Sequence, residues 1–179
     1  MFFNIPYTCN ESLDAIKSLL EHPEKVNEGT YLMQCKAWFE DYYPGYTAFM
    51  TTSCTRAMEL IALSMNLCAD DEIILSPYTY VGVGNAFSNY GAQLVYVDID
   101  KTTINIDASL IEAAITPKTK AVIAMHYAGI PCDMVMLEEI CSKHKLLLIE
   151  DNAQGMKVHH NNQKLGSFGD FSCISFDML

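Results

Sequence analysis

The spacing of hydrophobic positions changes along the chain, and the changes predict which segments form helices and which form strands. Apolar residues from Leu13 to Leu20 recur at helical spacing, which predicts a helix over Glu11–Glu21 with Asn10 as its N-cap. A second helix is predicted at about Thr30–Tyr43. The chain therefore opens with two helices before its pattern changes.

Short apolar runs follow, and they are typical of strands that are buried on both faces. The predicted strands are Thr47–Met50, Glu72–Ser76, Gln93–Val97, Ala121–Met125 and Leu146–Glu150. The helical segments between them are Thr55–Asn66, Val81–Asn89, Ala108–Ala114 and Met134–His144. This regular alternation predicts an α/β fold, with a mostly parallel sheet covered by helices on both faces.

The last part of the sequence has a different character. His159–Asn162 predicts a hairpin turn, and Asp170–Phe176 predicts one more buried strand. The sequence then stops at Leu179 without a further helix, which is unusual for a complete domain. We therefore expect the chain to be most of one larger domain, truncated at this point.

Composition and charge narrow the class of function. Half of the 179 residues are hydrophobic and 18% are charged, so the chain can form a core. The net charge of −11 argues against binding to nucleic acid or to anionic membranes. The seven cysteines are scattered without a CxxC pair and no signal peptide precedes them, so we expect reduced thiols and a cytoplasmic protein.

Ligands of open α/β sheets bind at the carboxyl ends of the strands, so the residues that follow each predicted strand are the candidates for chemistry. Thr51–Thr55 joins a strand to a helix and could hold a phosphate, although capping of the helix is the commoner role of such residues. Asp151 could pair with a protonated ring nitrogen or cap a turn. Tyr80 could stack on a flat ring or simply pack.

Two other patterns are rejected as sites. Gly82-Val83-Gly84 and the later Asp98 imitate a dinucleotide-binding fingerprint, but Phe87 occupies the third glycine position and the glycines come too late after the strand. No metal site is predicted, because ligand spacing is missing at His126, His144, His159 and His160.

Six segments in this order resemble the pyridoxal-phosphate-dependent sugar aminotransferases of the DegT/StrS family: TTSCTRAMEL, SPYTYVGVGNAF, VYVDID followed by INID, MHYAGIPCDM, IEDNAQG and LGSFGDFSCISF. The resemblance runs from Ile5 to Phe176. It implies the fold of aspartate aminotransferase (fold type I), in which two subunits share each active site. Residues 1–179 would then be the N-terminal part of the cofactor-binding large domain, without the C-terminal small domain.

The resemblance also implies roles for individual residues. Tyr80 would stack on the pyridine ring of the cofactor, Asp151 would pair with the ring nitrogen and keep it protonated, and Gln154 would contact the side of the phenolic oxygen. The cofactor phosphate would be held, chiefly through hydroxyl and backbone N–H groups, by Ser53, Cys54, Thr55 and Ser175.

The reaction implied by the resemblance is the transfer of an amino group from glutamate, through pyridoxal 5′-phosphate and pyridoxamine 5′-phosphate, to a keto sugar on a nucleotide. Overall similarity points to dTDP-4-keto-6-deoxyglucose as that sugar and to a homodimer as the assembly. The lysine that forms the Schiff base follows a Ser-Phe pair in the family, in a pattern like SFHxTK. Here the pair is Ser175-Phe176, so the lysine would follow Leu179, and Asp177 and Leu179 depart from the pattern. We expect residues 1–179 alone to be inactive, with a non-catalytic cofactor-binding module or a truncated remnant as alternatives.

Overall fold

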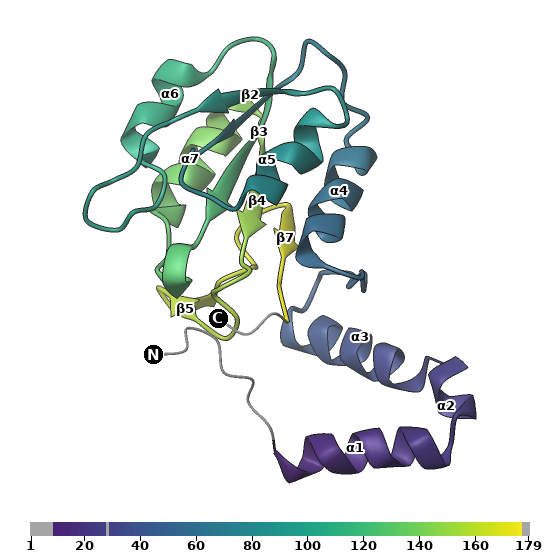
Figure 1. Ribbon diagram of the computed structural model, residues 1–179. Helices are drawn as coiled ribbons and strands as arrows, with labels where there is room; N and C mark the ends of the chain where they lie inside the picture. Colours follow the sequence, from purple (N-terminus) through teal and green to yellow (C-terminus); the bar gives the residue numbers. More distant parts are fainter. Residues whose placement is uncertain (1–8, 28, 177–179) are drawn as a thin grey trace, which may run out of the picture. The chain divides into compact units, whose positions relative to one another are not determined.

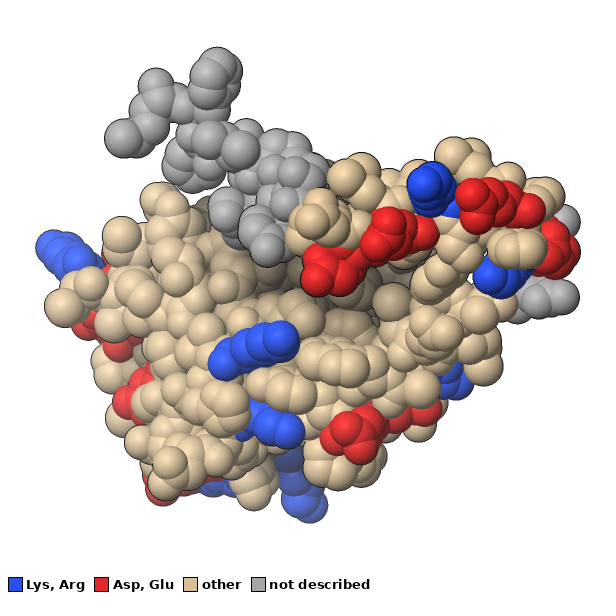
Figure 2. Space-filling model, turned by 90° about the horizontal axis from the view of Figure 1, so that it is seen from below, with Lys and Arg blue, Asp and Glu red and all other residues tan. Residues whose placement is uncertain are grey.

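The computed structural model describes residues 9–27 and 29–176 of the chain (Figure 1). The described residues fall into two compact units, of which the first ends at Met50 and the second spans Thr51–Phe176. Within the described residues, no helix is long and apolar enough to cross a membrane. In the view of Figure 2 the surface consists mostly of uncharged residues, with acidic and basic side chains scattered over it.

The first unit consists of helices. They are α1 (Asn10–Glu21), α2 (Glu24–Asn27) and α3 (Thr30–Tyr42). The prediction that Asn10 caps the first helix is wrong, because the helix begins one residue earlier than expected. Cys9 occupies the N-cap position, and no side chain accepts a hydrogen bond there.

The predicted strand Thr47–Met50 is also wrong. Residues 46–50 belong to no strand of the structure, and Phe49 is 70% exposed. The backbone N–H of Ala48 donates instead to Glu40 Oε1, at 3.2 Å. An apolar run becomes a strand only when a second strand takes up its backbone groups, and no strand of the described residues does so here.

The second unit is built on a five-stranded sheet in which every neighbouring pair of strands is parallel, in the order β2-β1-β3-β4-β7. Its strands are β1 (Glu72–Leu75), β2 (Gln93–Tyr96), β3 (Thr119–Met125), β4 (Leu147–Asp151) and β7 (Phe171–Cys173). This confirms the predicted parallel α/β sheet. The last strand is shorter than the predicted Asp170–Phe176, because its pairing with β4 covers three residues only.

Helices cover both faces of this sheet (Figure 1). They are α4 (Cys54–Ser64) and α5 (Val81–Ser88) on one face, and α6 (Ile111–Ala114) and α7 (Met134–His144) on the other, with short 3₁₀ turns η1 (Ala108–Leu110) and η2 (Tyr127–Gly129). Alternate strand residues serve the two cores: Ile73 and Ile149 lie in the core under α4 and α5, and Ile74 and Leu148 in the core under α7.

A small hairpin follows β4. Its strands β5 (His159–His160) and β6 (Gln163–Lys164) are antiparallel, and the turn residues Asn161 and Asn162 have φ values of 50° and 63°. Asparagine tolerates this left-handed conformation well, and two such residues in succession suit a two-residue hairpin turn. The predicted hairpin is confirmed.

Candidate functional site

The carboxyl ends of the parallel strands meet at one edge of the sheet, and the predicted site residues of the second unit gather there. Asp151 is the last residue of β4, and its register partners are Met125 at the end of β3 and Cys173 at the end of β7. The start of α4 adjoins this edge, since Cys54 packs on the core cluster that contains Cys173. Parallel pairing has therefore brought together segments that are far apart in the sequence.

Asp151 is a buried carboxylate with little compensation for its charge. Its side chain is 3% exposed, and it accepts a hydrogen bond from the backbone N–H of Ala153, at 3.2 Å. Burial raises the pKa of Asp151 above its usual value, against the lowering effects of the Ala153 bond and of nearby His126. A protonated nitrogen placed against this carboxylate would therefore gain an unusually strong partner.

The start of α4 combines a capping residue with free donors. Ser53 is the N-cap, and its Oγ accepts from the backbone N–H of Arg56 at 3.2 Å. The first N–H groups of a helix, here those of Cys54 and Thr55, have no acceptor within the helix. Ser53 thus caps the helix, while the backbone N–H groups of Cys54 and Thr55 could donate hydrogen bonds to an anion such as phosphate.

Tyr80 and Thr55 converge on Gly82. A Cβ atom built on Gly82 would lie 2.6 Å from Tyr80 Cε1 and 2.9 Å from Thr55 Oγ1, so only glycine leaves room for both side chains. The Tyr80 side chain is 65% exposed and remains available to a flat ring. The glycines that imitate a dinucleotide fingerprint therefore have a packing reason, which the sequence pattern did not reveal.

Gln154 is oriented by a neighbouring loop. Its Oε1 accepts from the backbone N–H of Ala128 at 2.6 Å, and Ala128 has a left-handed φ of 52°. Because the amide oxygen is engaged, the amide NH₂ is the group that Gln154 can offer to a ligand. The side chain is therefore arranged to donate a hydrogen bond.

Ser175 follows β7 by two residues. The strand ends at Cys173, the register partner of Asp151, so Ser175 lies on the chain that leaves the carboxyl edge. Its side chain is partly buried. Its phosphate-binding role stays a prediction, as do the binding roles of the other site residues.

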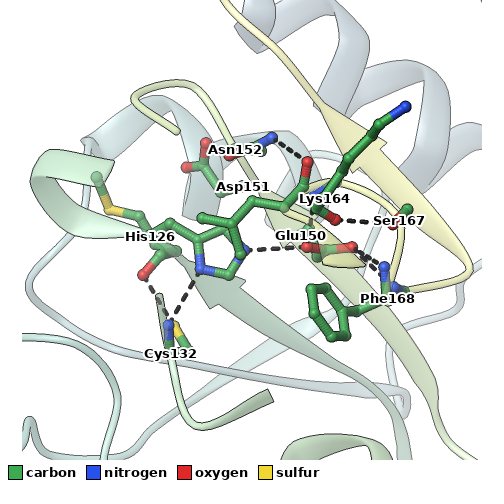
Figure 3. A network of polar contacts seen from close by, with 12 residues as sticks. His126, Cys132, Glu150, Asp151, Asn152, Lys164, Ser167 and Phe168 are labelled. Atoms are coloured by element: carbon green, nitrogen blue, oxygen red, sulfur yellow. Dashed lines mark hydrogen bonds and ion pairs between the residues drawn. The ribbon is translucent and has the colours of Figure 1, made fainter. Parts of the chain in front are cut away.

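A buried network that the sequence analysis missed lies beside Asp151 (Figure 3). Glu150 is fully buried and accepts from His126 Nε2 at 3.0 Å. It also accepts from the backbone N–H groups of Gly166, Phe168 and Gly169, at 2.7, 2.8 and 2.8 Å. Four donors thus compensate a single carboxylate, and they tie β3, β4 and the loop before β7 together.

The same network fixes the proton of His126. The backbone N–H of Cys132 donates to His126 Nδ1 at 3.2 Å, so the ring proton is on Nε2, where it donates to Glu150. His126 is therefore a core histidine whose two ring nitrogens both have hydrogen-bond partners. Two acids in sequence within an apolar strand, followed by a glycine-rich loop, are the signal that could have pointed to such an anchor.

The lysines described near the sheet of the second unit lie away from Asp151. Lys118 and Lys120 stand at the amino end of β3 and pair with Asp70 and Asp71 at 3.0 and 3.3 Å. In Figure 3 the amino group of Lys164 points away from Asp151. Among the described residues, no group of three or more histidine, cysteine or acidic side chains could hold a metal ion.

Comparison with known proteins agrees with the family resemblance found in the sequence. The model of the DegT/DnrJ/EryC1/StrS aminotransferase family matches residues 6–178. The chain is 32% identical to the spore coat polysaccharide biosynthesis protein SpsC of Bacillus subtilis, over 97% of this chain and 44% of SpsC. It is 36% identical to the GDP-perosamine synthase of Caulobacter vibrioides, over 83% of this chain and 40% of that protein.

Solved structures extend the similarity to the fold. An aminotransferase from Psychrobacter cryohalolentis matches with a TM-score of 0.91 at 29% identity, covering 98% of this chain and 45% of that one. NtdA of Bacillus subtilis, solved with bound cofactor PMP, matches with a TM-score of 0.75 at 30% identity, covering 87% and 38% of the two chains. The chain spans less than half the length of these relatives.

Proposed function

The chain belongs to the DegT/DnrJ/EryC1/StrS aminotransferase family, and from this premise we propose that its carboxyl-edge site binds pyridoxal 5′-phosphate and pyridoxamine 5′-phosphate. Its fold is the mostly parallel α/β fold of the fold type I aminotransferases. Residues 1–179 would form the N-terminal part of the large, cofactor-binding domain. The observation that carries the proposal is the buried, weakly compensated carboxylate of Asp151 at the edge where ligands of such sheets bind.

Asp151 would accept a hydrogen bond from the pyridine nitrogen and keep that nitrogen protonated. When bound, the cofactor supplies an electron sink for the negative charge that develops at the amino carbon, and a protonated ring makes the sink effective. Because burial raises the pKa of Asp151, the ionised carboxylate is costly without a partner and is stabilised when a cationic ring nitrogen lies against it. The residue types at this position therefore fit the cofactor.

The remaining residues would fix the position of the cofactor. Tyr80 would cover one face of its ring, and the NH₂ of Gln154 would donate to its phenolic oxygen. The phosphate would lie at the start of α4, where dipole and free N–H groups both favour an anion. Its donors would be the hydroxyl and backbone groups of Ser53, Cys54, Thr55 and Ser175.

The proposed reaction of the whole protein is transamination between glutamate and a keto sugar on a nucleotide. The names of SpsC and of GDP-perosamine synthase support sugar chemistry. For this chain we propose dTDP-4-keto-6-deoxyglucose as acceptor and dTDP-4-amino-4,6-dideoxygalactose as product, in a cytoplasmic homodimer used for polysaccharide or antigen synthesis.

Titration of the full chain with pyridoxamine 5′-phosphate tests the cofactor site, because this form needs no lysine. We expect saturable binding by the fluorescence of the ligand. Asp151→Asn should weaken binding roughly 10- to 100-fold, the value of a hydrogen bond to a charged group. The matched control is Asp98→Asn, an exposed carboxyl after the edge strand β2, which should bind like the parent. Equal affinity of the parent and Asp151→Asn would contradict the proposal.

Turnover is a separate matter. A transaminase needs a lysine at the reacting carbon, and the lysines at the amino end of β3 are held in surface ion pairs. We propose that residues 1–179 alone bind the cofactor without turnover. Incubation with pyridoxal 5′-phosphate, glutamate and the keto-sugar nucleotide should release no 2-oxoglutarate above a protein-free control. Release of product would overturn this part only.

A further inference from the structure

Asn105 is a buried amide to which the proposed function gives no role. It lies on the loop between β2 and η1 and is 3% exposed. Its Oδ1 accepts from the backbone N–H of Tyr127 at 2.9 Å, and its Nδ2 donates to the backbone C=O of Ile130, also at 2.9 Å. The Ile130 N–H closes the same turn by donating to the C=O of Tyr127. One side chain therefore holds both ends of the turn at residues 127–130.

The loop that carries Asn105 has hydrogen bonds of its own. Asp100 Oδ1 accepts from the backbone N–H groups of Thr102 and Thr103, at 2.9 Å each. The backbone N–H of Asp100 donates to the C=O of Asn105, also at 2.9 Å. These bonds fix the backbone on both sides of the loop, so the Asn105 amide acts from a defined position.

The turn has an unfavourable backbone conformation at Ala128. Its φ of 52° lies in the left-handed region that residues other than glycine rarely adopt, and Gly129 follows with a φ of 74°. Such a conformation persists only where the surrounding contacts impose it, and it is most frequent at functional sites. The two bonds from Asn105 at the ends of the turn are contacts of this kind.

The turn orients Gln154. The Ala128 N–H donates to Gln154 Oε1 at 2.6 Å, and a Cβ atom built on Gly129 would lie 2.9 Å from the backbone oxygen of Gln154. The turn thus adjoins both the side chain and the backbone of Gln154. Because an N–H group can only donate, the amide oxygen of Gln154 must face the turn, and the NH₂ is left for a ligand. Without this bond, either end of the amide could face the ligand.

We propose that Asn105 is a positioning residue of the cofactor site, which acts on Gln154 through the turn at Ala128. The inference rests on the proposed function, in which the NH₂ of Gln154 donates to the phenolic oxygen of the cofactor. Asn105 holds the turn, and the turn holds the amide oxygen of Gln154, so the amide meets the phenolic oxygen as a donor. A donor stabilises the ionised form of that oxygen and lowers the pH at which the bound ligand loses its phenolic proton.

Exchange of the Ala128 amide hydrogen tests the first link, in the full chain without any ligand. Asn105→Ala removes both side-chain bonds of the turn, and we expect Ala128 to exchange roughly 10-fold faster, measured by nuclear magnetic resonance. Gln154→Ala should give a similar increase, because it removes the acceptor itself. An exchange rate of Ala128 in Asn105→Ala equal to that of the parent would overturn the proposal.

Asn105→Asp is the conservative variant, and it keeps the test valid if Asn105→Ala does not fold. It retains an acceptor for the Tyr127 N–H but places a carboxylate against the C=O of Ile130. Ala128 should therefore exchange faster than in the parent at neutral pH. As the pH is lowered, the carboxyl takes up a proton that can donate to Ile130, and the rate should return toward that of the parent at the same pH. A ratio of the two rates that does not change with pH would contradict the proposal.

A double-mutant cycle with pyridoxamine 5′-phosphate tests the second link. Asn105→Ala should weaken binding roughly 2- to 10-fold, and it should raise the pH at which the bound ligand loses its phenolic proton, followed by absorbance. In a Gln154→Ala background, Asn105→Ala should change neither quantity further. A merely structural residue would give additive losses, or a loss of affinity without a shift of the pH midpoint. Either result would overturn the proposal.

Thr119→Ala is the matched control. Thr119 is buried at the amino end of β3, and its Oγ1 accepts from the backbone N–H of Thr116 at 2.9 Å. This variant loses a buried hydrogen bond at the opposite edge of the sheet, so it should bind the ligand like the parent. An equal loss of affinity in Thr119→Ala would mean that binding reports on general stability, and it would overturn the role of Asn105.

Failure of the proposed function is recognised separately. If the parent does not bind pyridoxamine 5′-phosphate, the cofactor site is wrong, and with it the role of Asn105 towards the cofactor. The exchange rates of Ala128 in the ligand-free protein still decide whether Asn105 positions Gln154.

Discussion

Glu150 and Asp151 are neighbours on one strand and both are buried, yet their surroundings are opposite. Glu150 accepts from four donors, whereas the one side-chain hydrogen bond described for Asp151 comes from Ala153. Successive strand residues point to opposite faces, so Glu150 lies on the α7 side and Asp151 on the side of α4 and α5. The compensated acid stabilises the fold. Burial of the weakly compensated acid destabilises it, and a cationic ligand group would offset that effect.

Loss of the Glu150 carboxylate should have the largest effect. Glu150→Ala leaves the His126 ring N–H and three backbone N–H groups buried without an acceptor. We expect the free energy of unfolding to fall by roughly 3–5 kcal/mol, as for other broken buried charge networks. Urea unfolding followed by circular dichroism measures the change.

The control for this prediction is Glu112→Ala. Glu112 pairs with Lys143 and His144 on the surface, at 2.7 and 2.9 Å. Surface pairs contribute at most about 1 kcal/mol, so this variant should remain close to the parent. A Glu150→Ala protein as stable as Glu112→Ala would show that the four donors find other acceptors.

Asp151→Asn should behave in the opposite way. Because burial disfavours the charged form of Asp151, removal of the charge should leave the free energy of unfolding unchanged or raise it at neutral pH. The same variant is expected to lose affinity for pyridoxamine 5′-phosphate. A clear loss of stability in the ligand-free protein would mean that Asp151 is structural, like Glu150.

The pH dependence of this difference has a defined sign. The pKa of Asp151 is raised in the folded protein, so between the unfolded and folded pKa values the folded state binds more protons. The contribution of Asp151 to stability therefore falls as pH rises through the folded pKa, and it is restored below the unfolded pKa of about 4. The advantage of Asp151→Asn over the parent should shrink as the pH is lowered. Paired urea titrations at several pH values measure it, and an advantage that grows in acid would contradict the assignment.

Gly82→Ala should have the smallest effect on stability. Alanine favours a helix by about 1 kcal/mol over glycine, and this gain opposes the cost of moving the exposed Tyr80 ring and the Thr55 hydroxyl, which lie 2.6 and 2.9 Å from the new Cβ. Stability should therefore change little, while affinity for pyridoxamine 5′-phosphate falls a few-fold because Tyr80 has moved. Asn85→Ala, on the exposed side of α5, controls for helix propensity and should leave affinity unchanged.

Much of the fold could be predicted because local spacing determines it. The helix Met134–His144 was predicted with its observed bounds, and five of the predicted strands occur in the sheet within a few residues. Thr47–Met50 has the same apolar character, but a strand also needs a neighbour, and the pattern of one segment contains no information about neighbours.

The site, like the fold, has a part that the sequence could predict and a part that it could not. The position of Asp151 follows from the end of an apolar strand, and the sequence analysis named it. The bond between His126 and Glu150 depends on the register of β3 against β4, and the packing of Cys54 on the core that contains Cys173 depends on how α4 lies on the sheet. Such contacts are decided by tertiary packing, so spacing along the chain could not predict them.

The Glu150 network also bears on the rate at which the protein unfolds. Its donors lie 16 to 24 residues from Glu150 along the chain, directly after a neighbouring strand and in a later loop. The network is complete only when these segments are already in place, so we expect it to form late in folding, a prediction that φ-value analysis of Glu150 variants would test. Interactions of that kind slow unfolding more than they speed folding, and Glu150 therefore contributes to the lifetime of the native state.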